Sequence, residues 1–234
     1  MEIYKGIEIV DLGIYIKKNK VLVISDLQIG YEDSLGKEGI FVPKFQYELL
    51  KKRLNKIFER VKPNLTIING DLKHEFGTIN DQEWRETLAI IDLIYTHCNK
   101  IILIKGNHDL ILEPIAKKRN IELVDYYKMD DILILHGHKV ILEALGSKVI
   151  IIGHEHPAVS LKDGIKIEKY KCYLKGKYGK SNIIVMPSLN LLNEGSDVLR
   201  GEVLSPFLRK NLGDFEVYIV EDRVYKFGKI KNLK

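Results

Sequence analysis

Five short runs of aliphatic residues occur along the first two thirds of the chain, and each ends abruptly in polar residues. The runs comprise residues 21–24, 65–68, 101–104, 132–135 and 149–152, and they are rich in valine and isoleucine. Unbroken apolar runs of this length, bounded by glycine and polar residues, are typical of strands that are buried on both faces of a sheet. The pattern therefore predicts five interior strands with polar loops at their carboxyl ends.

Segments with helical periodicity lie between several of these runs. Apolar residues recur at helical spacing over about residues 44–60, which predicts an amphipathic helix. Asn80, followed three residues later by Glu83, resembles a capping box and predicts a second helix that extends to about residue 96. A shorter helix is expected after Glu113-Pro114. The first half of the chain therefore alternates strands and helices, as βαβ units do.

The last third of the chain has a different pattern. Residues 165–178 alternate between polar and apolar side chains, and residues 181–186 form a further apolar run. Residues 215–227 are typical of a hairpin that turns at Glu221-Asp222. The last third is therefore expected to be rich in β-structure.

One fold accommodates both parts of the chain. We expect an α/β fold in which two mixed β-sheets pack against each other and helices flank them, an α/β/β/α sandwich. The chain has 234 residues, and its sequence contains no internal repeat and no linker rich in proline, glycine or serine. A single domain over residues 1–234 is therefore expected.

The composition excludes several classes of protein. Hydrophobic residues make up 45% of the chain and charged residues 29%, which excludes disordered, collagen-like and coiled-coil proteins. Two cysteines are too few for a disulfide framework, and no apolar run approaches the roughly 18 residues of a membrane span. We therefore expect a soluble cytoplasmic protein that does not bind membranes. The net charge of +5 permits a polyanionic partner without requiring one.

The candidate chemistry lies directly after the five predicted strands. In an open α/β sheet, ligands bind beyond the carboxyl ends of the strands. Six of the seven histidines lie just beyond these strand ends, which a random distribution would not produce. The polar residues that mark the five ends are Asp26, Asp71, Asn107, His136 and the pair His154 and His156.

This combination of side chains is typical of a site for divalent metal ions. Carboxylate oxygens, an amide oxygen and imidazole nitrogens suit ions of borderline hardness, and their number suits a pair of ions about 3.5–4 Å apart that share one carboxylate. Neither cysteine adjoins a motif, which argues against a structural zinc site. Taken singly, each histidine or the Asn-Gly-Asp segment could be an ordinary turn residue. The ordered set favours a dinuclear centre.

Five motifs follow the predicted strands in a fixed order. They are Asp26-Leu27-Gln28, Gly70-Asp71-Leu72-Lys73-His74, Gly106-Asn107-His108-Asp109, a separate His136, and Gly153-His154-Glu155-His156. In this order they resemble the motifs of the calcineurin-type metallophosphoesterase superfamily. The resemblance covers residues 26–156, and the β-rich remainder is similar to the second sheet of that family.

The resemblance implies a role for each of these residues. One metal ion would be held by Asp26, Gln28, Asp71 and His156, and the other by Asp71, Asn107, His136 and His154. Asp71 would bridge the two ions, together with a water or hydroxide. His108 would stabilise the phosphoryl transition state or protonate the leaving oxygen. The implied cofactor is a pair of divalent ions, Mn²⁺ in the first place, with Fe, Zn, Ni or Mg as further candidates.

Two positions depart from the usual motifs of the family. Gln28 stands where histidine is usual, and a neutral amide oxygen binds softer metals less well, so Gln28 is either a weak ligand or a polar turn residue. His74 stands where phosphatases of the superfamily have aspartate and where nucleases of the SbcD type have histidine. Residues 26–32 also resemble small archaeal SbcD-related phosphoesterases, and bacterial ligase-associated endonucleases of DNA repair are similar too, including near residues 185–188. The resemblance therefore favours phosphodiester cleavage, with His108 and His74 as catalytic residues.

Other polar residues fit more than one role. His138 is a candidate for contact with substrate phosphate, and a surface role fits it equally well. Asp109 and Glu155 are interpreted as residues that support the site without binding metal. Between Lys162 and Lys180, seven lysines are interspersed with tyrosines. Such a segment can follow a nucleic-acid backbone, or its lysines can protect an edge strand from aggregation.

Three hypotheses about function follow. The first is a metal-dependent phosphodiesterase or nuclease whose substrate is a phosphate ester, with nucleic acid as a candidate and a DNA-repair helicase, ligase or ATPase as a candidate partner. The second is a phosphomonoesterase or nucleotide hydrolase, because a compact chain leaves little room for contacts beyond the site. The third is a non-catalytic scaffold like the phosphoesterase-like subunit of retromer. Gln28 motivates the third hypothesis, whereas His108 and the remaining ligands oppose it.

Overall fold

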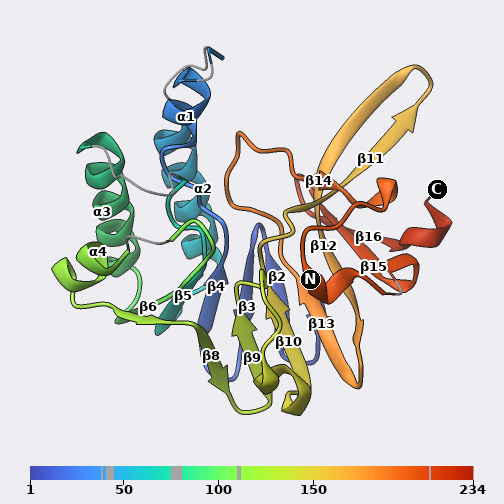
Figure 1. Cartoon of the computed structure of the whole chain (residues 1–234), viewed down its shortest axis with the longest axis horizontal. Helices are drawn as coiled ribbons and strands as arrows, with labels where there is room; N and C mark the ends of the chain where they lie inside the picture. Colours follow the sequence, from blue (N-terminus) through green and yellow to red (C-terminus); the bar gives the residue numbers. More distant parts are fainter. Residues whose placement is uncertain (38, 41–44, 75–80, 110–111, 211, 234) are drawn as a thin grey trace.

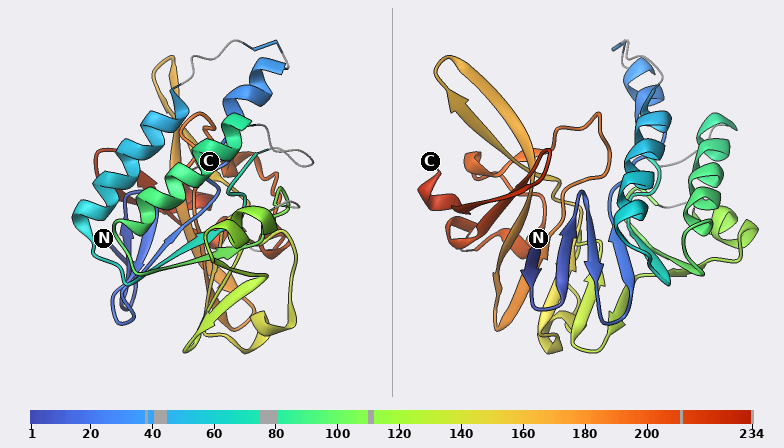
Figure 2. Two further views of the ribbon diagram at one scale, coloured as in Figure 1. Left: turned by 90° about the vertical axis from the view of Figure 1, so that its left-hand side faces the viewer. Right: turned by 180° about the vertical axis from the view of Figure 1, so that it is seen from behind.

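The structure is a computed structural model that describes residues 1–37, 39–40, 45–74, 81–109, 112–210 and 212–233. It contains two mixed β-sheets that pack against each other, and α-helices lie together on the outer side of the first sheet (Figure 1). The right-hand view in Figure 2 shows these helices on one side of the molecule and the last third of the chain on the other. The predicted α/β fold with two mixed sheets flanked by helices is confirmed.

The first sheet has seven strands that follow one another in chain order. Its first four strands are antiparallel, and the fourth to the seventh are parallel. The strands are β1 (Glu2–Tyr4), β2 (Ile7–Val10), β3 (Gly13–Ile16), β4 (Val21–Ile24), β5 (Leu65–Asn69), β6 (Lys100–Ile104) and β7 (Glu122–Val124). The helices that connect the parallel strands are α1 (Tyr31–Lys37), α2 (Gln46–Arg60), α3 (Asp81–Tyr95) and α4 (Glu113–Lys118).

The second sheet has nine strands, in the order β14-β11-β12-β13-β10-β9-β8, with β15 paired to β12 and β16 to β15. Its strands are β8 (Tyr126–Met129), β9 (Ile132–Leu135), β10 (Val149–Ile152), β11 (Pro157–Asp163), β12 (Lys166–Tyr178), β13 (Ser181–Val185), β14 (Ser196–Asp197), β15 (Glu216–Val220) and β16 (Val224–Lys229). Short 3₁₀ helices span Leu142–Gly146, Val198–Arg200, Pro206–Leu208, Leu212–Asp214 and Ile230–Asn232.

The central strands of the second sheet are buried on both faces. Ile151 of β10 belongs to the core between the two sheets, whereas its neighbours Ile150 and Ile152 belong to a second core on the outer face. Phe207 and Leu208, from one of the 3₁₀ helices, cover that outer face. Successive side chains of a strand point to opposite faces, so an unbroken apolar run is what two buried faces require.

The amphipathic helix α2 buries the residues that its periodicity predicted. Leu50, Leu54 and Ile57 are buried in the core between α2 and the first sheet. Its N-cap residue, Phe45, has no polar side chain, and the cap comes from α1 instead: the Phe45 N–H donates to Glu32 Oε1 over 2.8 Å. A carboxylate at this position satisfies a free N–H group and favours the positive end of the helix dipole.

Most predicted elements are confirmed, with small shifts at their ends. The five aliphatic runs form β4, β5, β6, β9 and β10, and the predicted hairpin forms β15 and β16. The predicted second helix is α3, whose expected cap Asn80 lies outside the described residues. The short strands β1 to β3 and β7, β8, β11 and β14, and helix α1, were not predicted. Within the described chain, none of the helices combines the length and the apolar character needed to cross a membrane.

Candidate metal centre

The candidate site lies where the parallel strands of both sheets end. β4, β5 and β6 are mutually parallel in the first sheet, and β9 and β10 are parallel in the second. Each expected donor follows one of these five strands within four residues of its last residue. The carboxyl ends of parallel strands meet at one edge of a sheet, so the packing of the two sheets brings donors from distant parts of the chain together.

The donors form two groups, and Asp71 belongs to both. The ligand atoms of Asp71, His136 and His154 lie within 4.8 Å of one another, and so do those of Asp26, Asp71 and His156. A carboxylate shared by two groups of donors is the arrangement that a pair of ions needs. The two groups divide the residues in the same way as the two ligand sets implied by the motifs.

Asn107 lies beside the first of these groups. His136 Nε2 lies 3.0 Å from Asn107 Oδ1 and 3.4 Å from Asp71 Oδ2. The other ring nitrogen of His136 is 3.2 Å from the carbonyl oxygen of Asn69. A carbonyl oxygen can only accept, so Nδ1 carries a proton and Nε2 faces the amide and carboxylate oxygens.

The second group is held by direct contacts with Asp26. His156 Nε2 lies 3.1 Å from Asp26 Oδ1. The Ser25 hydroxyl donates to Asp26 Oδ2 over 2.6 Å, and the His154 N–H donates to the same oxygen over 3.1 Å. Asp26 is fully buried. Its orientation is therefore fixed by neighbouring polar groups rather than by solvent.

The backbone around the donors is strained. Among the described residues, nine other than glycine have a positive φ, and five of them are residues of the candidate site. This left-handed conformation costs a residue with a Cβ of the order of 1 kcal/mol or more, and it persists where the surroundings impose it. The five are Asp26 (φ 56°), Gln28 (46°), Asp71 (45°), His154 (63°) and His156 (49°).

Glycines in the motifs allow the strand ends to approach one another. A Cβ on Gly70, whose φ is 77°, would overlap His136 Nδ1, and a Cβ on Gly153 would overlap the Ser25 hydroxyl. The motif glycines are therefore required by close packing between β4, β5, β9 and β10.

Burial and charge shift the pKa values of the donors in opposite directions. Burial alone would raise the pKa of Asp71, but the hydrogen bond and charge of His136 outweigh it and hold that pKa below its ordinary value. Burial alone would lower the pKa of His136, but its bond to Asp71 and the charge of Asp26 raise it to about 9. Burial, with the charge of His136, lowers the pKa of His154 to about 4. Without metal, a proton on His136 therefore holds the two carboxylates together.

Gln28 lies in the loop after β4, and its side chain is held by the side-chain amide of Asn190. It is buried, its N–H donates to the Asp71 carbonyl over 2.9 Å, and its Oε1 accepts from Asn190 Nδ2 over 3.1 Å. Asn190 Oδ1 accepts from the backbone N–H of Leu192, which fixes the orientation of the Asn190 amide. One lone pair of the Gln28 oxygen is thus occupied, and a second is left for a further partner.

His108 and His74 lie beside the donors and contact each other. The His108 N–H donates to Asp71 Oδ1 over 3.0 Å, and His108 Nε2 lies 3.9 Å from Asp71 Oδ2. His108 Nδ1 is 2.8 Å from the carbonyl oxygen of His74, and the two rings stack with centroids 5.5 Å apart. Nδ1 is therefore the protonated nitrogen, and Nε2 is the atom that faces the donors.

His138 lies at the edge of the group. Its ring centroid is 5.4 Å from that of His136 and 6.1 Å from that of His154. Burial lowers the pKa of His138 to about 4, with the positive charge of His136 in the same direction. His138 is therefore a neutral ring next to the donors at neutral pH.

A family model provides the decisive comparison with known proteins. The model of the calcineurin-like phosphoesterases matches residues 19–211, which include every donor described above. The chain belongs to the calcineurin-like phosphoesterase family. The enzymes of this family are hydrolases that act on phosphoric esters, and this phosphoesterase is assigned to that class.

Several solved structures are similar to this phosphoesterase, and the first of them shares its fold. Nuclease MPE of Pseudomonas putida is 18% identical, with a TM-score of 0.66 over 94% of this chain and 93% of that one. The phosphoesterase YfcE of E. coli is 12% identical, with a TM-score of 0.40 over 89% and 97% of the two chains. Vps29 of Entamoeba histolytica is 15% identical, with a TM-score of 0.40 over 89% and 99%. No sequence among the curated proteins matches the chain.

The donor set of the phosphoesterase fits a pair of divalent cations. Within the described ranges, the ion pairs of the buried carboxylates Asp26 and Asp71 are made with imidazoles alone. Buried negative charge is costly unless a cation meets it, and oxygen with imidazole donors suits borderline-hard metals. Neither cysteine belongs to the donor groups: Cys98 Sγ donates to a helix carbonyl, and the Cys172 side chain packs in the outer core of the second sheet.

Further polar residues contact the donors of the phosphoesterase from outside the five motifs, and Ser188 among them ends the segment 185–188 whose resemblance was noted above. They follow β13, which is parallel to β10 and therefore ends at the same edge. Ser188 Oγ donates to the Asp26 carbonyl over 2.8 Å, and Asn193 Nδ2 is 3.3 Å from His156 Nδ1. The position of this loop after a parallel strand could have indicated these residues from the sequence. The loop contains neither a histidine nor an aspartate, however, so it did not resemble a metal-binding motif.

Asp109 and Glu155 support the loops, as expected. Asp109 accepts hydrogen bonds from the N–H groups of Gly106 and Leu72, so it joins the loops after β5 and β6. Glu155 Oε2 accepts from the N–H groups of Leu204 and Ser205 over 2.9 and 2.8 Å. Backbone donors therefore occupy both oxygens of Asp109 and one oxygen of Glu155.

Proposed function

We propose that this phosphoesterase cleaves phosphodiester bonds with a pair of divalent cations, Mn²⁺ being preferred, and that nucleic acid is its substrate class. The observation that carries the proposal is the membership of Asp71 in both groups of donors. The first ion would be held by Asp26, Asp71, His156 and Gln28, and the second by Asp71, Asn107, His136 and His154. A bound cation pair supplies Lewis-acid chemistry: it activates water and neutralises charge on phosphate oxygens.

The chain itself supplies the proton chemistry through His108. The bond from Nδ1 to the His74 carbonyl fixes the ring, so Nε2 is directed toward Asp71 and the donors. A protonated Nε2 at this position can give its proton to the leaving oxygen, or stabilise charge on the phosphoryl group. His74 acts in this proposal as a positioning residue for His108, through its carbonyl and its stacked ring.

Two features support a diester rather than a monoester. The resemblance to nucleases depends on His74, because nucleases of the SbcD type have histidine at this motif position. The ring of His74 stacks on that of His108. A nuclease, MPE of Pseudomonas putida, shares the fold over most of both chains. A role in DNA repair, with a helicase, ligase or ATPase that delivers the substrate, is part of the same proposal.

Hydrolysis assays test this proposal directly. The protein is incubated with Mn²⁺ and bis-p-nitrophenyl phosphate, p-nitrophenyl phosphate or single-stranded DNA. We expect the diester and the DNA to be cleaved, and Asp71→Ala and His108→Ala to lose at least about 100-fold in rate, since each removes part of the charge stabilisation or the proton donor. Unchanged rates in both variants would overturn the mechanism, and a strong preference for p-nitrophenyl phosphate would favour a phosphomonoesterase instead.

Metal titration provides an independent test. Calorimetry of the metal-free protein with Mn²⁺ is expected to give two bound ions, and Asp71→Ala is expected to bind fewer. A protein that binds no ion would fit the scaffold hypothesis. His97→Ala is the matched control, because His97 stacks on Phe58 at the far end of α3.

A further inference from the structure

A cavity of about 250 Å³ lies where the two sheets meet beside α2. It is lined by residues from five separate segments: the β2–β3 turn, α2, β12, the loop after β13 and the β15–β16 turn. The charged residues of its lining are Arg53, Lys169, Lys171, Glu194 and Glu221. None of these side chains belongs to the donor groups of the metal centre.

Lys171 is a positively charged group of the cavity whose buried nitrogen lacks a partner among the described residues. Its ammonium nitrogen is buried and makes no hydrogen bond within the part of the chain that the structure describes. Lys169 and Arg53 differ, since Lys169 pairs with Glu194 at 3.4 Å and Arg53 Nε pairs with Asp11 at 2.6 Å. Because an ammonium without a partner is costly to bury, burial lowers the pKa of Lys171 to about 7, against the attraction of Asp26. An anion that enters the cavity would supply the missing partner and hold the proton on this nitrogen.

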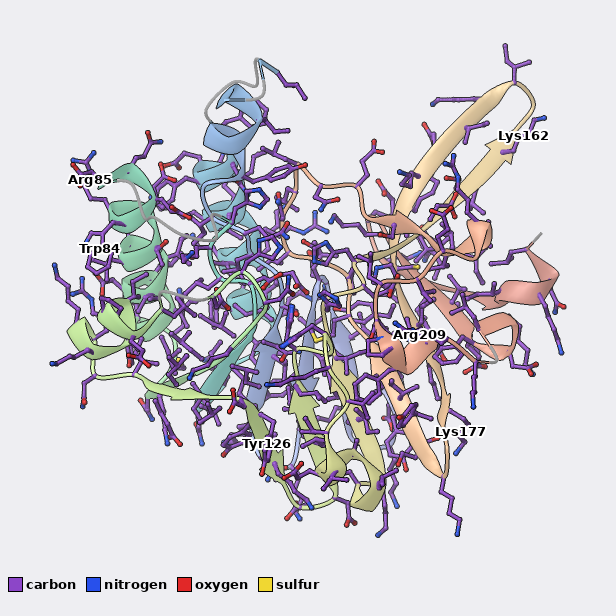
Figure 3. All side chains as sticks on the ribbon, viewed as in Figure 1. Trp84, Arg85, Tyr126, Lys162, Lys177 and Arg209 are labelled. Atoms are coloured by element: carbon purple, nitrogen blue, oxygen red, sulfur yellow. The ribbon has the colours of Figure 1, made fainter. Side chains whose placement is uncertain are left out.

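The cavity adjoins the metal centre. Lys171 of β12 pairs with Ala158 of β11, two residues after His156. The distance between Lys171 and His156 combines the rise of two residues along a strand with the spacing between neighbouring strands. Their Cα atoms are therefore roughly 8 Å apart. Leu191, which also lines the cavity, follows Asn190, the partner of the Gln28 side chain. Figure 3 shows Lys162 near the outer end of β11 and Lys177 at the opposite end of β12, so Lys171 lies between them along the hairpin.

We propose that this cavity binds a second phosphate group of the substrate, next to the one at the metal centre, with Lys171 as its principal cation. The inference rests on the proposed phosphodiesterase activity, since a polynucleotide carries a further phosphate on either side of the one that is cleaved. The ammonium offers three donors, and the Arg53 guanidinium keeps N–H groups beyond the one given to Asp11. Apolar surface is added to the lining by Leu12, Tyr170, Leu191 and Val220.

The charges in the cavity predict two opposite effects. Lys171→Met removes the free cation, whereas Glu221→Gln removes a carboxylate that repels the phosphate. Charge-assisted hydrogen bonds change affinity by about 10-fold or more, so Lys171→Met is expected to raise KM for a substrate with two phosphates by about that factor. Glu221→Gln is expected to lower that KM, and kcat should stay unchanged in both variants.

Three thymidine dinucleotides distinguish binding of the second phosphate from binding of the phosphate that is cleaved. TpT has one phosphate, whereas pTpT and TpTp have a second on the 5′ or 3′ side. We expect Lys171→Met to leave KM for TpT unchanged and to raise it for pTpT or TpTp. Lys175→Met is the matched control, because Lys175 lies on the same strand, pairs with Glu216 at 3.6 Å and is outside the cavity. An unchanged KM for both two-phosphate substrates would overturn the proposal, while TpT cleavage would still support the diesterase activity.

Binding and stability provide readouts that do not depend on turnover. In EDTA, the logarithm of the binding constant for a labelled thymidine decamer should fall linearly with the logarithm of the salt concentration. The slope should be less steep by about 0.7 in Lys171→Met. Inorganic phosphate is tested as a competitor to distinguish a site for a free anion from a site for a substrate phosphate. If Lys171→Met changes competition by inorganic phosphate but leaves KM for the dinucleotides unchanged, the second-phosphate site is refuted. Replacing an unpartnered ammonium with methionine should keep or raise the melting temperature, whereas a purely structural lysine would lower it.

Discussion

The proton on His136 makes the stability of the metal-free protein depend on pH. His136 lies between Asp26 and Asp71, with its ring nitrogens 3.6 and 3.4 Å from their carboxylate oxygens. Burial would lower its pKa, but these carboxylates raise it from 6.5 to about 9. A raised pKa means that the folded protein binds this proton more tightly than the unfolded chain does. The stabilisation is therefore complete below pH 6.5 and is lost as the pH rises through 9.

The size of the effect follows from the same pKa values. Each pKa unit corresponds to about 1.4 kcal/mol, so a pKa that rises from 6.5 to about 9 contributes about 3 kcal/mol to the free energy of unfolding. His154 acts in the opposite sense, since its pKa falls to about 4 and protonation of the unfolded chain lowers stability below pH 6.5. Above pH 7 the buried amine of Lys171, whose pKa burial lowers to about 7, adds stability as the pH rises, so the loss that comes from His136 is isolated by comparing the protein with and without Mn²⁺.

Urea unfolding in EDTA, followed by the fluorescence of Trp84 at pH 6.5 to 9.5, measures this loss. With saturating Mn²⁺ the loss should be much smaller, because bound cations then hold the carboxylates together in place of the proton. His97→Asn is the control, since it removes a histidine outside the site and should keep the pH dependence. A free energy of unfolding with the same pH dependence from 6.5 to 9 in EDTA and in saturating Mn²⁺ would refute the reasoning.

Three further outcomes are expected. Gly153→Ala should weaken Mn²⁺ binding by at least about 10-fold in calorimetry, because the added Cβ displaces Ser25 from Asp26; undiminished affinity would contradict the close packing described here. Tyr173→Phe should lower the free energy of unfolding by about 1–3 kcal/mol without changing kcat, because its buried hydroxyl donates to two carbonyl oxygens of the β2–β3 turn, over 3.1 and 3.0 Å. Gln28→His should raise affinity for Zn²⁺ relative to Mn²⁺ in competitive titrations, and an unchanged ratio would indicate that this side chain does not bind metal.

The fold and the main donors could be predicted because both depend on simple features of the sequence. Strands buried on two faces have unbroken apolar runs, and the residues that follow parallel strands must gather at one edge. Asp26, Asp71 and His136 could therefore be identified without knowledge of the packing of the sheets. Their division into two groups around Asp71 came from the family resemblance and not from the runs themselves.

Other features depend on contacts between distant segments and could not be predicted. Asn190 follows a parallel strand, but an asparagine in a loop has many roles, and only the structure shows it bonded to Gln28. Lys171 belongs to a segment of alternating lysines, which favours an exposed side chain. Its burial depends on the β2–β3 turn and on the loop after β13, which lie far from it in the sequence. The strands β1 to β3 are short, and their pairing rather than their length defines them.

The left-handed backbone of the donor loops also bears on how such a centre is retained over time. Glycine adopts these angles at little cost, so replacing Gln28 or His156 with glycine would relieve strain in a lineage that no longer needed the reaction. Without selection for the reaction, glycine at these positions would therefore be favoured by the stability of the loops alone. That five residues with side chains still hold these angles is what continued selection for their chemistry would leave behind.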